Sequence, residues 1–348
     1  MNRRDRLVRA LHGEPVDALP IWLMRQAGRH LPGYRALRAR YGILDLARSP
    51  DLAARVTIEP LDRFDLDAAI VFADITVPFF GLGVDFRIDP GVGPVVARPV
   101  RDADGVEALR PFDAERDAGF VGAAIRRFLE RRPDRPILGF AGAPFTLASY
   151  LIEGGASKDY LETRRFLHRD PAAFALLLDR LTEVAIDYLT MQARAGAEAL
   201  QLFDTWAGQL PRPLYETVIL PRLRTLFDAL APLDRPTIYF STGSDHLLDL
   251  AARSHATALG VDWRVPLGRV RRAVGPSVAL QGNLDPAALL TDAETVRRMA
   301  RGVLDEIPDG RAHVFNLGHG MPPEADPTCV EALVRFVHEY SAARTGTP

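Results

Sequence analysis

Cysteine is almost missing from this sequence, because Cys329 is the only one in 348 residues. A disulfide within the chain is therefore excluded, and so is a metal site that needs several thiolates. Cys329 lies in the pattern Thr-Cys-Val-Glu-Ala-Leu, which is typical of a helix, so we expect a packed thiol rather than a nucleophile. Lysine is equally scarce, since Lys158 is the only lysine among 43 basic residues. One arginine is therefore weak support for a function, whereas the spacing of several is informative.

Long apolar runs are also lacking. No stretch of about 18 apolar residues is present that would span a membrane, and the opening Met-Asn-Arg-Arg-Asp-Arg lacks the apolar core of a signal peptide. We therefore expect a cytoplasmic protein without a membrane partner. The net charge of −2 argues against a general nucleic-acid-binding protein. If the ligand is an acid, the attraction must be local to its site.

Acidic residues are absent from residues 24–38, a stretch that carries Arg25, Arg29, Arg35 and Arg38. Guanidinium groups are planar forks that bind carboxylates and phosphates, with roughly 1.5–3 kcal/mol for each charge-assisted hydrogen bond. A helix that merely faces solvent would mix in acids to balance this charge. The stretch therefore indicates a ligand with several acidic groups. On composition alone, the alternative is a surface cluster in an arginine-rich protein.

Eight short apolar runs alternate with longer helical patterns, as expected of parallel strands that are buried on both faces. The runs are residues 21–25, 68–72, 136–140, 199–203, 236–240, 256–261, 278–281 and 313–316. Residues 84–87 and 95–98 predict an extra hairpin between the second and third strands. The alternation predicts an α/β fold, a single-domain (β/α)8 barrel over residues 1–348. A doubly wound sheet is the alternative, but no glycine-rich phosphate loop follows the first run.

Helix starts are marked by capping residues before prolines. Ser49, Asp170 and Asp285 each precede a proline, which predicts a helix beginning at that proline. Pro60 predicts an end or a kink in the first of these helices.

Polar residues follow the ends of the predicted strands. Catalytic residues of (β/α)8 barrels come from the carboxyl ends of several strands. Here Arg25 follows the first strand, Asp74 the second, Tyr150 the third, Asp204-Thr205 the fourth and His319 the eighth. The barrel hypothesis gathers these dispersed residues at one mouth. The acids that precede the second strand fall at the opposite end: Asp62, Asp65 and Asp67.

Five motifs in this order carry a specific resemblance over nearly the whole chain. They are Met-Arg-Gln-Ala-Gly-Arg at 24–29, Gly-Phe-Ala-Gly-Ala-Pro-Phe-Thr-Leu at 139–147, Tyr150 with Glu-Gly-Gly at 153–155, Gln-Gly-Asn-Leu-Asp at 281–285 and Asn-Leu-Gly-His-Gly at 316–320. With these motifs the chain resembles the uroporphyrinogen decarboxylase family. The resemblance implies a distorted barrel, usually a homodimer, that uses no metal and no organic cofactor. It also implies the reaction of haem biosynthesis that decarboxylates the four acetate arms of uroporphyrinogen III to give coproporphyrinogen III.

Asp74 matches the family's central carboxylate. An ionised carboxylate only accepts hydrogen bonds, and pyrrole N–H groups only donate them. The resemblance therefore implies that Asp74 binds the inward-pointing N–H groups and stabilises positive charge that develops on the ring. The alternative for Asp74 is the cap of a following helix.

Arg25, Arg29 and Arg38 match carboxylate-binding arginines of the family. The resemblance assigns them to the acetate and propionate arms, and it leaves an additional acid role of Arg25 open, since a guanidinium pKa above 12 makes proton donation costly. Backbone contacts to the substrate are expected from the residues between the first two arginines: Gln26, Ala27 and Gly28.

Tyr150, Thr205 and His319 match positions that contact the substrate in the family. Each offers a polar hydrogen to a carboxylate, and Tyr150 or His319 could also relay a proton. The alternatives are a buried aromatic with a satisfied hydroxyl for Tyr150 and a structural histidine in a glycine-bounded turn for His319.

Two other functions compete with the decarboxylase. A corrinoid-linked methyltransferase of the related barrel family would bind zinc through histidine and cysteine, but no His-x-Cys occurs and the sole cysteine lies beyond the eighth strand. A non-catalytic tetrapyrrole-binding protein would keep the arginine stretch and could lose Asp74.

Overall fold

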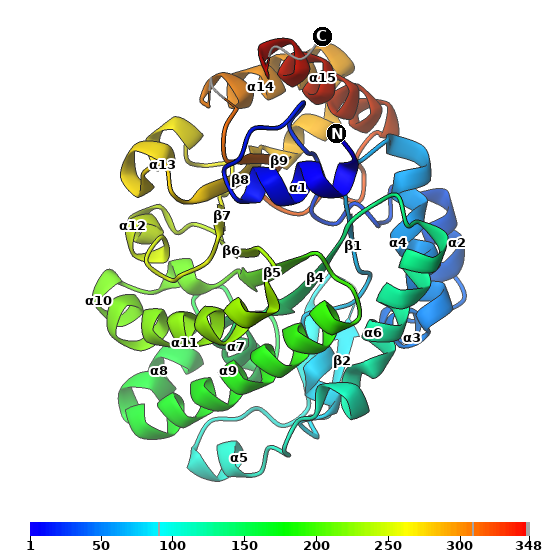
Figure 1. Cartoon of the computed structure of the whole chain (residues 1–348). Coiled ribbons are helices and arrows are strands. Elements are labelled where there is room, and N and C mark those ends of the chain that lie inside the picture. The colour runs from blue at the N-terminus through cyan, green and yellow to red at the C-terminus, as the bar shows by residue number, and fades with distance from the viewer. Residues whose placement is uncertain (90, 308–309, 346–348) are drawn as a thin grey trace.

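The computed structural model describes residues 1–89, 91–307 and 310–345. Its main sheet is parallel throughout and curls through the centre of the molecule (Figure 1). In spatial order the strands are β1 (Ala69–Ile70), β4 (Ile137–Gly142), β5 (Ala199–Asp204), β6 (Thr237–Ser241), β7 (Ala258–Gly260), β8 (Ala279–Leu284) and β9 (His313–Leu317). Every residue of β4 and β8 is buried, which fits a sheet covered on both faces.

The first predicted strand, residues 21–25, closes this sheet but is reduced to a single bridge. Ile21 pairs in parallel with Phe315 of β9, whose N–H donates to the Pro20 carbonyl at 2.9 Å. On the other flank the Asp67 N–H donates to the Ile21 carbonyl at 2.8 Å. The segment therefore lies between β9 and the start of β1, so that the eight predicted runs form the predicted barrel in a distorted form.

Helices surround the strands (Figure 1). The α-helices are α1 (Arg3–Leu11), α2 (Pro32–Arg38), α3 (Ile43–Arg48), α4 (Pro50–Phe64), α5 (Ala103–Glu107), α6 (Ala114–Arg131), α7 (Pro144–Glu153), α8 (Leu161–Arg169), α9 (Pro171–Arg194), α10 (Arg212–Leu214), α11 (Leu220–Leu230), α12 (Leu248–Ala251), α13 (Leu267–Val274), α14 (Ala293–Asp305) and α15 (Pro327–Thr345). Short 3-10 or π turns are η1 (Val77–Phe80), η2 (Ala207–Gln209), η3 (Tyr215–Ile219), η4 (Ala231–Leu233), η5 (Asp245–Leu247) and η6 (Pro286–Leu290). None of the described helices has the length and apolar character needed to cross a bilayer.

The capping signals are confirmed in position but differ in detail. Asp170 accepts a hydrogen bond from the third residue of α9, whereas Asp285 caps only the 3-10 turn η6. Ser49 precedes α4 without a side-chain cap. Of the two outcomes predicted for Pro60, an end of the helix does not occur, because α4 continues to Phe64 and stops where Asp65 adopts a left-handed φ of 44°.

The extra hairpin is confirmed with shifted bounds, β2 (Phe86–Asp89) and β3 (Gly93–Val96). The pairs run antiparallel from Phe86 opposite Val96 to Asp89 opposite Gly93. Gly91, between the strands, and Gly93, at the start of β3, both have positive φ, a conformation that glycine adopts without steric cost in hairpin turns. Cys329 is buried in α15, as expected of a packed thiol.

An ion cluster around Asp67 locks the closed barrel at the amino ends of its strands. The buried carboxylate pairs with Arg6 of α1 at 2.8 Å and with His338 of α15 at 2.7 Å, and it also pairs with Arg3. The same carboxylate accepts the Ile21 N–H at 2.8 Å. Burial acts to raise the Asp67 pKa, but the His338 ring and Arg3 outweigh it and hold this pKa at about 2. One side chain thus joins both terminal helices to the closing segment.

Asp67→Ala should lower the free energy of unfolding by roughly 3–5 kcal/mol at pH 7, because it leaves buried cationic and N–H partners without their acceptor. The Asp67 pKa is depressed on folding, so the carboxylate contributes fully above pH ~4, and its contribution is lost as pH falls through about 2. Urea unfolding of the parent and the variant across this range measures both effects.

Asp62→Ala is the matched control, since Asp62 is exposed and pairs with Arg132 at the surface. Its removal should cost about 1 kcal/mol or less. Equal losses in the two variants would contradict the role assigned to Asp67.

Candidate active site

The carboxyl ends of the strands carry most of the predicted site residues. Asp74 follows β1, Tyr150 lies on α7 after β4, Thr205 directly follows β5 and His319 follows β9. The charges of Asp74 and Arg25 both act on the Tyr150 hydroxyl, and the charge of Arg25 also acts on the His319 ring. The mouth of the barrel therefore brings Arg25, Asp74, Tyr150 and His319 into one electrostatic neighbourhood.

Arg29 and Arg38 form a neighbouring group around Tyr34 of α2. Both guanidinium charges act to lower the pKa of the Tyr34 hydroxyl, against the larger raising effect of its burial. Arg38 also donates to the Tyr41 carbonyl at 2.6 Å. No interaction among the described residues joins Arg29 or Arg38 directly to Asp74 or His319, so these arginines flank the first group rather than belong to it.

The turn that carries Arg25 is held by the side chain of Gln26. Its Oε1 accepts the Leu23 N–H at 2.9 Å and its Nε2 donates to the Ala68 carbonyl at 3.1 Å. Gln26 is buried, and its backbone N–H also donates to the Leu23 carbonyl at 2.8 Å, so its side chain and its N–H both serve the fold. Arg25 has a φ of 64°, which is uncommon outside glycine and marks a backbone held by its surroundings.

Arg25 forms no ion pair with a carboxylate anywhere in the described part of the chain. Ala27 and Gly28 are both partly exposed in the following bend, which leaves their backbone accessible. A guanidinium at the mouth of a barrel without a protein counter-ion suits an acidic ligand.

Asp74 combines a capping role with a free oxygen. Its Oδ1 accepts the Thr76 N–H at 2.9 Å and the Thr76 hydroxyl at 2.5 Å, which caps the turn leading into η1. No hydrogen bond to Oδ2 is formed among the described residues. The capping alternative is therefore correct for one oxygen only, and the other can accept hydrogen bonds from a ligand.

Tyr150 is a phenol that resists ionisation. Burial, and next to it the Asp74 charge, raise the pKa of its hydroxyl, and Arg25 only partly opposes them. Its ring meets the Trp206 ring edge to face, with centroids 6.1 Å apart. Tyr150 is therefore a hydrogen-bond donor at neutral pH rather than an anion.

His319 is a neutral imidazole at pH 7. Burial lowers its pKa to about 4, with further lowering from Arg25 and Arg264 and an opposing effect of Asp262. Its ring packs against the rings of Trp263 and Phe240, at centroid distances of 5.9 and 6.5 Å. The described residues give the imidazole no hydrogen-bond partner, so its polar atoms are available to a ligand.

Thr205 connects this mouth to the next strand through its backbone. Its carbonyl accepts the Thr242 hydroxyl at 2.6 Å, just after β6. The Thr205 side chain is half-buried, which is compatible with the predicted contact to a carboxylate arm.

Asp204 is a buried carboxylate that the sequence analysis placed after β5 without selecting it. Its Oδ1 accepts the Thr146 hydroxyl and its Oδ2 accepts the Tyr239 hydroxyl, both at 2.8 Å. The Tyr239 oxygen in turn accepts the Tyr215 hydroxyl at 3.2 Å. The available signal was an acid ending an otherwise apolar run. Burial raises the Asp204 pKa to about 6, against the lowering effect of these hydroxyls.

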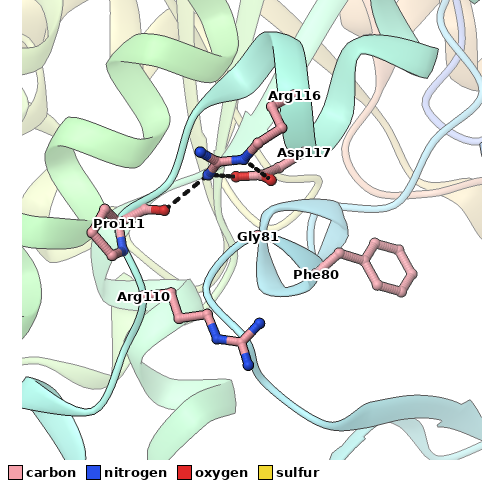
Figure 2. Close-up of a pocket in the computed structure, with 6 residues that line it drawn as sticks. All are labelled: Phe80, Gly81, Arg110, Pro111, Arg116 and Asp117. Carbon is pink, nitrogen blue, oxygen red and sulfur yellow. Dashed lines mark hydrogen bonds and ion pairs between the residues drawn. The ribbon is translucent and has the colours of Figure 1, made fainter.

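A separate hollow of about 360 Å³ lies beyond η1, and none of the predicted site residues lines it (Figure 2). Its wall contains Phe80, Gly81 and Arg110, and across from them Arg116 is paired with Asp117 at 2.6 Å. The acid neutralises one of the two arginines. The hollow is therefore distinct from the barrel mouth.

Residues 2–340 match the family model described as uroporphyrinogen decarboxylase (URO-D). A uroporphyrinogen decarboxylase of Streptomyces griseus is 45% identical over 335 residues, which cover 96% of this chain and 92% of that protein. One from Geobacillus thermodenitrificans is 41% identical over 346 residues, with 99% and 100% coverage.

Solved structures extend the likeness of the fold. A methyltransferase from Methanosarcina mazei superposes with a TM-score of 0.84 at 21% identity, covering 98% of this chain and 99% of its own. A B12-independent methionine synthase from Shewanella sp. W3-18-1 gives a TM-score of 0.56 at 13% identity, with 94% and 96% coverage. At these identities the likeness concerns the fold alone.

Asp204→Asn should change how stability depends on pH. Because folding raises the Asp204 pKa from 3.8 to about 6, the folded parent holds a proton that the unfolded chain has lost between these values. The stability of the parent relative to the variant should therefore fall by up to roughly 3 kcal/mol as pH rises from about 4 to 6. Denaturant unfolding of both proteins at several pH values measures this difference, and a difference that does not vary with pH would refute it.

Proposed function

The chain belongs to the uroporphyrinogen decarboxylase family, a family of carboxy-lyases, and on that premise we propose that it decarboxylates the four acetate arms of uroporphyrinogen III to give coproporphyrinogen III. The observation that carries the proposal is the family match over residues 2–340. It supports neither the corrinoid-linked methyltransferase nor the non-catalytic tetrapyrrole-binding protein. We further propose a single barrel domain over residues 1–348, of which 90, 308–309 and 346–348 lie outside the described residues.

The reaction needs an electron sink and protons. Protonation of the pyrrole carbon beside an acetate gives a cationic ring, which accepts the electron pair released when the bond to carbon dioxide breaks. A second proton, added to the resulting exocyclic carbon, completes the methyl group, and the first leaves the ring carbon. Each acetate therefore consumes one proton overall. In our proposal no metal and no organic cofactor takes part.

We assign Asp74 to the binding of the pyrrole rings of the substrate. Its Oδ2 is available to accept pyrrole N–H groups, while the bonds from Thr76 to Oδ1 keep the carboxylate in a fixed orientation. A fixed negative charge stabilises the cationic ring more than the neutral one, which lowers the barrier selectively. Arg25, whose guanidinium also acts on Tyr150 and His319, binds a carboxylate arm beside the reacting ring.

The remaining side chains bind the periphery of the substrate. Arg29 and Arg38 take further carboxylate arms, and Thr205 donates its hydroxyl to another. Tyr150 and His319 are neutral at pH 7, so both act as hydrogen-bond donors that add no charge to the site. The backbone next to Arg25 contributes further contacts at Gln26, Ala27 and Gly28. The family resemblance also supports a homodimer in the cytoplasm.

The proposal is tested by anaerobic incubation of the metal-stripped protein with uroporphyrinogen III, followed by oxidation and chromatography of the porphyrins. Stepwise conversion from eight to four carboxylates is the expected result. A folded protein that binds the substrate but leaves all eight carboxylates in place would favour the non-catalytic alternative.

Asp74→Ala should lower kcat by roughly 100-fold or more, since it removes charge stabilisation made in the transition state. Asp74→Glu should retain part of the activity, because a carboxylate is still present. Asp89→Ala, which removes a half-buried acid of the hairpin paired with Arg87, is the control and should behave like the parent. Near-normal turnover of Asp74→Ala would overturn the role of Asp74.

Arg29→Lys should raise KM about tenfold, because an ammonium keeps the charge but loses the bidentate fork. Arg40→Lys serves as the control, since Arg40 is exposed nearby and its guanidinium lies over the Tyr41 ring. Steady-state kinetics with uroporphyrinogen III compares the three proteins. An unchanged KM for Arg29→Lys would show that Arg29 does not bind an arm of the substrate.

A further inference from the structure

The side chain of Arg25 lies directly against the backbone of Gly320. A Cβ atom placed on Gly320 would overlap Arg25 Cδ and would lie 2.7 Å from its Nε and 2.9 Å from its Cγ. Gly320 is not among the glycines with positive φ, so its backbone conformation is open to any residue. The requirement for glycine at 320 is therefore one of space for Arg25.

Hydrogen bonds fix the two chain segments on either side of this contact. The Met321 N–H donates to the Met24 carbonyl at 2.8 Å, and the Met24 N–H donates to Asn316 Oδ1 at 2.9 Å. Asn316 is buried, and the same oxygen accepts the Leu317 N–H at 2.8 Å. The end of β9 and the loop after it are thus bonded to Met24, directly before Arg25, on either side of His319.

The backbone of Arg25 cannot retreat from an obstacle at position 320. Its φ of 64° is held by the bonds from Gln26 to Leu23 and Ala68 described above. The flexible part of the contact is the arginine side chain alone. An obstacle at 320 would therefore turn the guanidinium away and leave the fold in place.

We propose that Gly320 is a positioning residue whose missing side chain provides the space for Arg25, and so holds its guanidinium where it acts on both Tyr150 and His319. The inference rests on the proposed role of Arg25 in binding the substrate. It assigns a function to a glycine that itself offers no side-chain chemistry.

Gly320→Ala tests the inference. We expect a folded protein with a melting temperature close to that of the parent and with kcat/KM reduced at least tenfold. In the Arg25→Ala background the same change should alter kcat/KM less than twofold, because the crowded side chain is already gone. If Gly320→Ala lowers kcat/KM by the same factor in the Arg25→Ala background as in the parent, the proposal is overturned.

The pKa of His319, followed by NMR in the absence of substrate, reports on Arg25 independently of activity. The charged groups that act on this ring are Arg25, Arg264 and Asp262. Displacement of Arg25 should raise the pKa above about 4 in Gly320→Ala, as in Arg25→Ala. An added methyl group that left Arg25 in place would increase the burial of the His319 ring and so lower its pKa. An unchanged or lower pKa in Gly320→Ala, with Arg25→Ala raising it, would refute the displacement.

The two tests separate this inference from the proposed function. If Arg25→Ala turns over normally, Arg25 has no role in the reaction, yet a raised His319 pKa in Gly320→Ala would still support the space-filling argument. If Gly320→Ala alone is unstable, Arg25→Ala should restore its stability. If the double variant is as unstable as Gly320→Ala, the instability does not come from crowding between the added methyl group and the Arg25 side chain.

Two other glycines provide matched controls. Gly318→Ala would bring a Cβ against the backbone of Asp262 and Trp263, which cannot move aside. This variant should therefore have a lower melting temperature than the parent, whereas Gly320→Ala should lose activity and keep its melting temperature. Gly302 lies in α14 with nothing within 4 Å of an added Cβ. Gly302→Ala should therefore retain parental kinetics with equal or higher stability.

Discussion

The arrangement of the mouth depends on the closure of the barrel around Asp67. This buried carboxylate holds Arg3 and Arg6 of α1, His338 of α15 and the Ile21 N–H together. The closing segment contributes only one bridge to the sheet, so it has few ladder bonds of its own to keep it in place. The ion cluster supplies the missing constraint, and a buried charge of this kind is tolerated because every partner is present.

The two aspartates at the ends of β1 show how environment assigns chemistry. Asp67 precedes the strand and is surrounded by cations, so both of its oxygens are occupied by the fold. Asp74 follows the strand, at its carboxyl end. Its Oδ1 is used for the turn, and its Oδ2 is left for a ligand. Of two side chains of the same type, Asp67 therefore helps to close the barrel at one end, and Asp74 offers a negative charge for binding at the other.

Charge is distributed unevenly between the protein and its mouth. The whole chain carries a net charge of −2, and several of its arginines pair with acids, among them Arg3, Arg116 and Arg222. At the mouth Arg25 lacks such a partner among the described residues, while burial keeps Tyr150 and His319 neutral. Arg25 is thus available to an acidic ligand at the mouth, although the protein as a whole is not basic.

The sequence by itself located seven strands and the closing segment of the main sheet, since short apolar runs alternate with helical patterns along the chain, and its motifs carried the family. It left open whether α4 ends or kinks at Pro60, and it shifted both strands of the hairpin by two residues, because local rules compete with packing. Only the tertiary structure decided that Arg29 and Arg38 gather at Tyr34, that Asp204 is buried among hydroxyls, and that Arg25 lies on Gly320. Periodicity and caps act between near neighbours in the chain. The contact of Arg25 with Gly320 arises only when closure of the barrel brings its first and last segments together, and the bond from Tyr239 to Asp204 arises because β5 lies beside β6 in the sheet.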